Sequence, residues 1–403
     1  MSLLDRLSDE SCWNQFYEYK ISLACPGHFE RELRDFIDRK AYLPVCERIY
    51  AGERFPLPKR SMISKHASAK KRMVYTYPHD ENIVLKLLTY LLLRRYDEVF
   101  EDNLFSFRPG KCAKDAIRRL KRTPDMGRLY SYKVDIHDYF NSVPIPVFLP
   151  LLKQITADDP KLYEFLCGLL QEPCAVVDGN AVACKKGIMA GTPLASFYAN
   201  LYLRELDHCF AKKHIPYARY SDDIILFAMT REEIEKHATF VRDFLSSHGL
   251  SVNPDKECFA GPKDGWTFLG FSFREDVIDI APVTVKKLKQ KMRRKRDALM
   301  RWRVRGGHSP ENAARAFIRV FNRKLLESSG DNELTWSYWF FSVIGTTESL
   351  REIDLYAQDC IRYLVSGKHT KARFKVRYED MKNMGYRSLV HAYYEFTHSL
   401  PSS

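Results

Sequence analysis

Two adjacent aspartates, Asp222 and Asp223, lie in the stretch RYSDDIILFA, directly before a run of bulky apolar residues. Neighbouring carboxylates repel each other, and keeping both ionised beside a hydrophobic core is costly. Aspartate is also common at hairpin turns, because its side chain bonds its own backbone. The pair alone therefore leaves open both a simple turn and a functional site.

A third aspartate, Asp135, ends an apolar strand predicted over residues 129–136, in the stretch KVDIHDYF. If this strand pairs with the hairpin that carries Asp222, the two carboxylates point at one spot. Carboxylates are hard oxygen ligands suited to Mg²⁺. Two such ions, about 3.5–4 Å apart, can activate an attacking oxygen and stabilise a leaving one in phosphoryl transfer. The pattern predicts two Mg²⁺ ions, with Mn²⁺ as a substitute, and no His/Cys cluster competes as a zinc site.

The formal net charge of +13 is concentrated in one segment. Residues 281–324 carry 15 Lys or Arg against only Asp297 and Glu311, so the rest of the chain nets zero. A solvated helix face is the ordinary interpretation of a charge run. A stripe this concentrated favours a polyanionic partner such as nucleic acid.

Composition excludes several other classes of protein. With 403 residues, 45% of them hydrophobic, the chain can bury a large core and is not a disordered chain. No apolar run reaches the roughly 18 residues of a membrane span, and no signal-peptide pattern is present. The ten cysteines contain no C-x-x-C pair. They indicate reduced thiols in a cytoplasmic protein without a membrane partner.

The predicted scaffold mixes strands and helices without regular alternation, which favours the α+β class. Periodicity predicts a basic loop at KHASAKKR, a strand–turn–strand at ARYSDDIILFA and a hairpin within 266–282. Helices are expected at 80–100, 145–171, 192–210, 231–249, 285–305 and 310–326, with a helical tail beyond.

Five motifs resemble boxes of reverse transcriptases, in that family's order, over roughly residues 60–280. Each box is modest alone, but the set is highly specific. The motifs are Phe107–Gly110 (Phe-Arg-Pro-Gly), Asp135–Phe140 (first palm motif), Ala190–Ser196 running into Ala199–Leu203, Tyr220–Asp223 (Tyr-x-Asp-Asp) and Phe268–Phe271 (primer grip).

The resemblance implies an α+β right-hand polymerase with fingers, palm and thumb. The expected domains are a helical N-terminal extension (1–58), a fingers and palm core (59–280) and a basic helical thumb (281–330). A helical, RNA-binding extension of the thumb is expected over 331–403.

The resemblance also assigns roles at the metal site. Asp135 and Asp222 would hold both ions, helped by the backbone of Ile136. Asp223 would support the site, and strand alternation predicts that it points partly away from Asp222. Lys256 matches a lysine proposed to protonate pyrophosphate, although a surface lysine after a turn is equally ordinary.

A second set of residues is expected at the incoming dNTP. Fingertip cations would clamp the triphosphate, with a solvated basic loop as the alternative. Phe140 matches an aromatic gate that excludes the ribose 2′-hydroxyl, with a core aromatic as the alternative. Ala190 stands where most of the family has glutamine, so low fidelity is expected. The full set is Lys65, Lys70, Arg72, Asp138 (through its backbone), Tyr139, Phe140, Ala190 and Gly191.

Nucleic-acid contacts are expected from the primer grip and from cations. The helix Val285–Arg305 is expected to meet a duplex backbone through sequence-independent phosphate contacts. Its apolar contacts would come from Met292, Leu299, Trp302 and Val304. The primer-grip residues are Phe268, Leu269 and Gly270, and the cations are Arg108, Lys286, Lys289, Arg293, Arg294, Arg296 and Arg301.

Within the family, the compact chain and its RSLVHAYY ending most resemble the free-standing bacterial "unknown group", in particular type 2 defence-associated reverse transcriptases. This implies an RNA-directed DNA polymerase in phage defence that copies a structured non-coding RNA into an RNA/DNA hybrid, with reiterative copying as one expected mode. One alternative is a reverse transcriptase of a diversity-generating retroelement. Another is an RNA-binding splicing cofactor with a vestigial polymerase site, which the intact aspartates disfavour.

Overall fold

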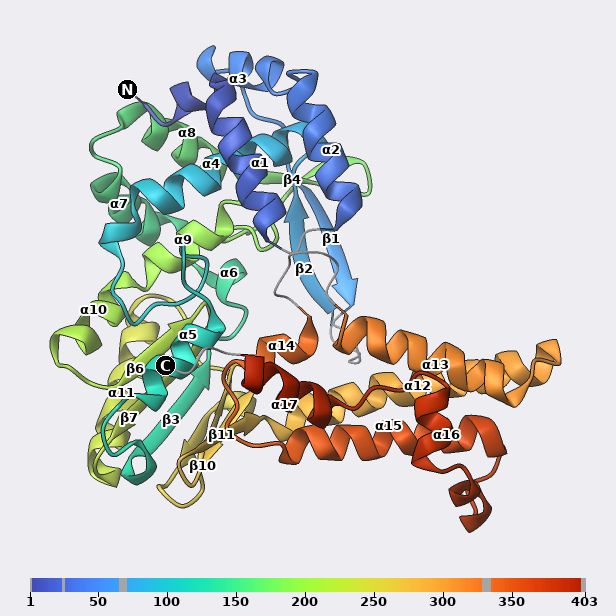
Figure 1. The fold of residues 1–403 in the computed structure, drawn as a ribbon. Helices are drawn as coiled ribbons and strands as arrows, with labels where there is room; N and C mark the ends of the chain where they lie inside the picture. Colours follow the sequence, from blue (N-terminus) through green and yellow to red (C-terminus); the bar gives the residue numbers. More distant parts are fainter. Residues whose placement is uncertain (1, 24–25, 65–70, 328–334, 400–403) are drawn as a thin grey trace. The chain divides into compact units, whose positions relative to one another are not determined.

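The computed structural model describes residues 2–23, 26–64, 71–327 and 335–399 (Figure 1). Contacts divide the chain into two compact units, Met1–Pro262 and Lys263–Ser403. The boundary falls earlier than the predicted one after residue 280. The reason is that β9 (Trp266–Phe268), β10 (Phe271–Arg274) and β11 (Val277–Ile280) pair only with one another, and β11 also packs on a helix of the second unit.

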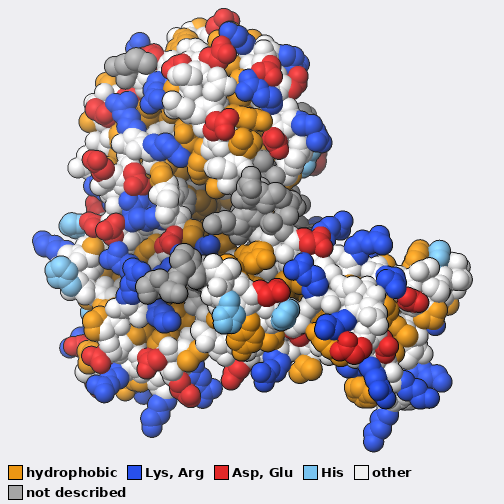
Figure 2. All heavy atoms as spheres, in the orientation of Figure 1, with side chains coloured by type: hydrophobic (Ala, Val, Ile, Leu, Met, Phe, Trp, Pro, Cys, Tyr) orange, Lys and Arg blue, Asp and Glu red, His pale blue; other side chains and the backbone are white. Residues whose placement is uncertain are grey.

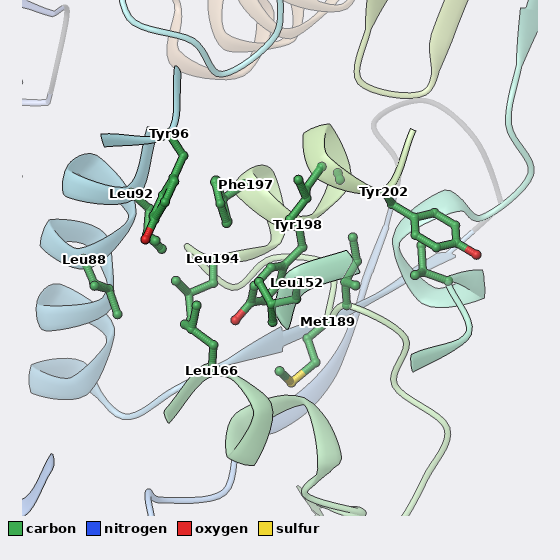
Figure 3. Close-up of a cluster of buried hydrophobic side chains, with 14 of the residues drawn as sticks. Leu88, Leu92, Tyr96, Leu152, Leu166, Met189, Leu194, Phe197, Tyr198 and Tyr202 are labelled. Carbon is green, nitrogen blue, oxygen red and sulfur yellow. The ribbon is translucent and has the colours of Figure 1, made fainter. Parts of the chain in front are cut away.

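Helices surround a large core in the first unit (Figure 1). Most sides of α4 (His79–Arg95) are buried, as its apolar run predicts. Figure 3 shows Leu88 and Leu92 of this helix in one buried cluster with Leu152, Leu166, Phe197 and Tyr198. The other helices are η1 (Leu4–Ser8), α1 (Glu10–Ser22), α2 (Gly27–Asp38), α3 (Leu43–Tyr50), α5 (Ala113–Lys121), α6 (Tyr139–Ser142), α7 (Ile145–Ile155), α8 (Pro160–Gln171), α9 (Ala195–Tyr202), α10 (Arg204–Lys212) and α11 (Arg231–Ser247), with short 3-10 turns at η2 (Asp97–Val99), η3 (Met126–Arg128) and η4 (Pro254–Lys256).

An antiparallel sheet of order β6-β7-β3-β8 forms the other part of this core. Its strands are β3 (Tyr130–Asp135), β6 (Tyr217–Tyr220), β7 (Asp223–Ala228) and β8 (Cys258–Ala260). The apolar run that follows the two aspartates is buried in β7. α11 packs on β3 and β7, and α5 packs on β6 (Figure 1). The predicted strands at 129–136 and 219–228 are confirmed.

A second sheet, of order β2-β1-β4-β5, was not predicted. β1 (Lys59–Ser64) and β2 (Lys71–Thr76) form an antiparallel hairpin where the sequence indicated only a basic loop, and β4 (Cys174–Val177) pairs with β5 (Asn180–Ala183). β1 meets β4 at Lys59 and Val176, a contact between segments far apart in sequence. Such long-range pairing leaves no local periodicity to detect.

The second unit consists of the three-stranded sheet of β9, β10 and β11 and a helical bundle that follows it in the chain. α15 (Glu348–Ser366) packs against α12 (Pro282–Gly306), α13 (Pro310–Leu325) and α17 (Leu389–Ser399). The remaining elements are α14 (Trp336–Phe341), η5 (Lys371–Lys375) and α16 (Tyr378–Asn383). On the face drawn in Figure 2, Lys and Arg side chains recur over these helices. Within the described ranges, no helix combines the length and apolar character that a membrane span needs.

Two predicted apolar contacts of the basic helix are wrong. Met292 and Leu299 are buried against the bundle, but Val304 is 74% exposed. Trp302 is 42% exposed and stacks on His308, with ring centroids 3.7 Å apart. The last turns of α12 still contact α15, but they do so through Arg303, which donates to the Leu364 carbonyl at 2.8 Å, and not through Trp302 or Val304.

Candidate active site

The three predicted carboxylates converge at one end of the β6-β7-β3-β8 sheet. Asp135 at the end of β3 lies opposite Asp223 at the start of β7. One carboxylate oxygen each of Asp135, Asp222 and Asp223 lies within 4.8 Å of the other two. The predicted pairing of the Asp135 strand with the Asp222 hairpin is therefore confirmed.

Asp223 shares this cluster, which strand alternation did not predict. Residues directly opposite each other on paired strands lie on the same face of a sheet, so Asp223 faces the same side as Asp135. Ser221 takes a left-handed φ of 60°, and this turn directs Asp222 toward the same space. Although Asp223 was expected to point partly away from Asp222, one carboxylate oxygen of each lies within 4.8 Å of the other.

The cluster is electrostatically strained. Burial, and then the charge of Asp135, raises the pKa of Asp222. Burial, and then the charges of Asp222 and Asp135, raises the pKa of Asp223 to about 6. A divalent cation would relieve this repulsion, and three carboxylate oxygens are the hard donors that Mg²⁺ prefers. The residues present therefore fit the predicted ion site.

Lys256 supplies a positive charge at the same place. Its Nζ lies 2.5 Å from Oδ2 of Asp135, although the side chain is 49% exposed. The loop before it is fixed to the end of β3, because the Asn253 N–H donates to the Asp135 carbonyl at 2.8 Å. The Lys256 ammonium therefore neutralises part of the negative charge that a bound metal ion would otherwise neutralise. Its proposed proton transfer to pyrophosphate remains a prediction.

A buried ion pair supports the turn that carries Asp222, and the sequence analysis missed it. Arg219 is fully buried and binds Asp207 through two contacts, Nε to Oδ1 at 2.8 Å and Nη2 to Oδ2 at 2.5 Å. The same guanidinium donates to the carbonyls of Asn200 (3.0 Å) and Ser221 (3.3 Å). Arg219 thus links the turn to α9 and α10.

A second set of bonds fixes the turn from its other side. The N–H of Ser221 donates to Oγ of Ser106 at 2.8 Å, and that hydroxyl donates to Oδ1 of Asn200 at 3.0 Å. Asn200 in turn donates to the Ser106 carbonyl at 2.8 Å. Asn200 lies in the motif segment Ala199–Leu203, and Arg219 lies directly before the Tyr-x-Asp-Asp box, which was the available signal.

Arg72 and Phe140 lie together beside the cluster. The guanidinium of Arg72 is 5.7 Å from the centroid of the Phe140 ring. Its charge also acts on Asp222 in the direction that lowers the pKa of that carboxyl. Phe140 is half-buried, and its carbonyl accepts from the Ile188 N–H at 2.8 Å. Lys65 and Lys70, the other predicted fingertip cations, lie outside the described residues.

The two residues before Phe140 differ in whether their side chains are accessible to a nucleotide. Asp138 is exposed with a left-handed φ of 42°, and its Oδ1 accepts from Asn141 at 3.1 Å. Tyr139 is 2% exposed, and its hydroxyl donates to the Ala199 carbonyl at 2.6 Å. The Tyr139 side chain is therefore a core element, and only its backbone is left to meet a nucleotide.

Ala190 and Gly191 are pressed against β2. Ala190 is 1% exposed, and its carbonyl accepts from the Tyr75 N–H at 2.7 Å. Gly191 has a φ of 98°, and an added Cβ would meet the Tyr75 carbonyl oxygen at 3.0 Å and Val74 at 3.1 Å. Glycine is needed here for both reasons. The Ala190 side chain offers little surface to a ligand.

Comparison with known proteins decides the family. Residues 58–273, more than half of the chain, match the family model described as reverse transcriptase (RNA-dependent DNA polymerase). The chain belongs to the reverse transcriptase family. The match includes all three clustered aspartates and all five motifs in full.

Individual relatives of this reverse transcriptase are distant. The retron Ec86 reverse transcriptase of Escherichia coli is 22% identical over 175 residues, which is 42% of this chain and half of the retron enzyme's length. Telomerase from Candida albicans, in complex with a fragment of telomeric RNA, is 13% identical, with 91% of this chain and 71% of that chain covered and a TM-score of 0.47. A truncated apo telomerase from Candida tropicalis is 13% identical, with 58% of each chain covered and a TM-score of 0.44.

Arg108 is held by its own loop, and its contact with nucleic acid remains a prediction. It is 8% exposed and binds both carboxylate oxygens of Asp97, at 2.8 and 3.0 Å. Its remaining N–H groups face the carbonyls of Glu101, Leu104 and Asp97. The guanidinium of the Phe-Arg-Pro-Gly motif therefore holds its own loop together in this reverse transcriptase.

The predicted primer grip is a tight hairpin turn. Leu269 and Gly270, between β9 and β10, both have positive φ, 50° and 87°. Phe268 is buried, and the Gly270 carbonyl accepts from the Ala281 N–H at 2.9 Å. The turn presents the Leu269 side chain, and its contact with a primer remains a prediction.

The predicted thumb cations fall into two groups. Lys289 pairs with Glu352 at 2.5 Å, and Arg296 pairs with Asp297 at 2.6 Å and lies 4.9 Å from the Tyr363 ring. These two are held within the bundle, because their face of α12 packs on α15, and their contact with nucleic acid remains a prediction. The exposed group consists of Lys286, Arg293, Arg294 and Arg301.

We predict that Asp223→Asn stabilises the metal-free protein. At pH 8 Asp223 is ionised in the folded state against a pKa raised from 3.8 to about 6, so its ionisation destabilises the fold. Removing the charge should raise the free energy of unfolding by roughly 1–3 kcal/mol in EDTA. Denaturant melts with and without Mg²⁺ measure this. Mg²⁺ should stabilise the wild type more than the variant, and equal responses would contradict the site.

We also predict that Asp207→Asn costs about 3–5 kcal/mol of stability, because it leaves Arg219 buried without a counter-charge. The matched control is Glu235→Gln. It breaks an exposed pair with Arg231, whose side chains are 55% and 75% exposed. That variant should change stability by less than about 0.5 kcal/mol. Urea denaturation compares the two, and similar small losses would show that the buried pair does not support the turn.

Proposed function

We propose that this chain is an RNA-directed DNA polymerase that copies a cognate structured non-coding RNA into cDNA in antiviral defence. The single observation that carries the polymerase activity is the cluster of Asp135, Asp222 and Asp223 within a matched reverse transcriptase segment. A vestigial site would have no reason to keep three mutually repelling carboxylates together.

In this proposal Asp135 and Asp222 hold two Mg²⁺ ions, with the backbone of Ile136 nearby and Asp223 adding charge. Ions held by these carboxylates would activate the attacking 3′-oxygen and neutralise charge on the leaving phosphate. The chain itself fixes the position of the two carboxylates. The Ile136 N–H donates to the Asp222 carbonyl at 3.2 Å, which joins the end of β3 to the turn before β7. Lys256 lies at the same site and is the proposed proton donor to pyrophosphate.

The incoming dNTP would lie beside Arg72 and Phe140. Arg72 offers a planar, permanently charged group for the triphosphate. The Phe140 ring, held by that cation and by the Ile188 contact to its carbonyl, would exclude a 2′-hydroxyl. The β1–β2 hairpin then corresponds to fingers, the β6-β7-β3-β8 sheet to the palm and the second unit to the thumb.

The biological role rests on the subfamily resemblance. The similarity to a retron enzyme covers half of that enzyme, so partner and pathway are proposals for this chain. The mixed basic and aromatic residues of 366–394 suit RNA, which proteins bind through stacking and phosphate contacts. Sequencing of the nucleic acid that co-purifies with the protein tests this role: one recurrent structured RNA supports it, whereas a variable-repeat transcript would indicate a diversity-generating element.

Primer extension tests the activity. With Mg²⁺, dNTPs and a primed RNA template, the wild type should make DNA and Asp222→Asn should make none above background. Asparagine keeps the shape of the side chain but removes the charge that holds the ions. The control is Asp178→Asn, at an exposed hairpin turn between β4 and β5 with a φ of 49°. Retained synthesis by Asp222→Asn would contradict the assignment.

Sugar selection tests Phe140. Phe140→Ala should incorporate ribonucleotides at least about tenfold more readily relative to dNTPs, since a clash with the 2′-hydroxyl would be lost and tenfold corresponds to only about 1.4 kcal/mol. Phe374→Ala, which removes a phenylalanine 54% exposed in the second unit, is the control. Single-nucleotide incorporation with matched rNTP and dNTP measures the ratio. An unchanged ratio would mean that Phe140 only packs.

A further inference from the structure

A groove in the second unit lies between α12 and α13 and ends at α14. Its volume is about 430 Å³, within the range of small-ligand pockets. The floor is apolar and the rim is basic. The floor consists of Leu288, Met292, Phe317, Val320, Phe321, Leu325 and Trp336, and the rim of Thr284, Lys287, Lys291, Lys295 and Lys324.

The rim carries four lysines and no carboxylate. None of these lysines forms an ion pair with a carboxylate among the described residues, in contrast to Lys289 on the face of α12 that packs on α15. Repulsion among unpaired ammonium groups around an apolar surface disfavours an empty groove and favours an anionic occupant. The occupant must combine negative charge with a flat or apolar part.

The spacing of the rim suits a chain of negative charges. Lys287, Lys291 and Lys295 repeat every four residues, so they lie about 6 Å apart along one side of α12. Lys324 lies on the opposite side, on α13. Trp336, half-buried against Phe340 with ring centroids 4.8 Å apart, closes one end with an indole ring. Aromatic rings of this kind stack on nucleobases.

We propose that this groove binds unpaired nucleotides of single-stranded RNA, with a base against Trp336 and the floor and phosphates on the four lysines. The proposal rests on the proposed function, which supplies a structured RNA with loops. A base in a duplex has its Watson–Crick edge covered by its partner and its two faces covered by the stack, so no face is free to lie against Trp336. The site is therefore one for the RNA partner's loops, apart from any duplex contact by Lys286 or Arg293.

The test measures binding of a short unstructured RNA by the full chain carrying Asp222→Asn, without dNTPs. In that background, the triple variant Lys287→Gln, Lys291→Gln and Lys295→Gln should make the dependence of log affinity on log salt less steep. The magnitude of the negative slope should fall by about 2, at about 0.7 per lost phosphate contact. The charge-matched control is Lys212→Gln with Lys213→Gln and Lys236→Gln, three exposed lysines of the first unit, and it should leave the slope unchanged.

Trp336 provides the second measurement. Trp336→Ala should weaken single-stranded RNA about tenfold and remove the fluorescence change of a 2-aminopurine base in the probe, whereas Trp336→Phe should retain most of both. A blunt RNA duplex of equal length should be affected by neither set of variants.

Equal loss of duplex binding would overturn the proposal, and so would an unchanged salt slope. Binding of an acidic peptide or an anionic vesicle that depends on the same lysines, with RNA binding unaffected, would also overturn it. Primer extension on a pre-annealed template by the groove variants, with Asp222 restored, reports the proposed activity separately. Failure of the groove therefore leaves the polymerase assignment standing.

Discussion

The structure of the first unit depends on holding three like charges together. Asp135, Asp222 and Asp223 would separate if they were free, because the charge of Asp135 raises the pKa of Asp222 and both charges raise the pKa of Asp223. Strand pairing prevents this: β3 and β7 are in register so that Asp135 faces Asp223, and six residue pairs along the two strands fix that register. A slip by one residue would turn Asp135 to the other face of the sheet.

The surroundings of the cluster follow from this constraint. The turn that directs Asp222 toward the cluster contains Ser221 in a left-handed conformation. Hydrogen bonds with Ser106 and Arg219 hold this turn from both sides. The buried pair of Arg219 with Asp207 is costly to desolvate, and the same guanidinium donates to the Ser221 carbonyl within the turn. Lys256 then offsets part of the charge when no ion is bound.

Sequence patterns were sufficient for elements with strong local signals. The apolar strand before Asp135, the strand after Asp223 and the long helix α4 all appear where periodicity places them. The β1–β2 hairpin was missed, because its partly exposed, charged strands show no alternation and one partner, Val176, is distant in sequence. Burial could not be read from charge alone, so Arg108 and Arg296 were predicted to bind nucleic acid although each is held within the protein.

The site residues show the same division. Three aspartates could be predicted to meet because two motifs had to pair, whereas the Arg219–Asp207 pair depends on the packing of α10 against β6, which no motif records.

Crystals soaked in Mn²⁺ with primed template and a non-reactive dNTP analogue provide the most direct measurement of the proposed metal site. The account predicts two anomalous peaks about 3.5–4 Å apart, in contact with Asp135 and Asp222. Peaks elsewhere, or none at the cluster while the nucleotide is bound, would contradict it.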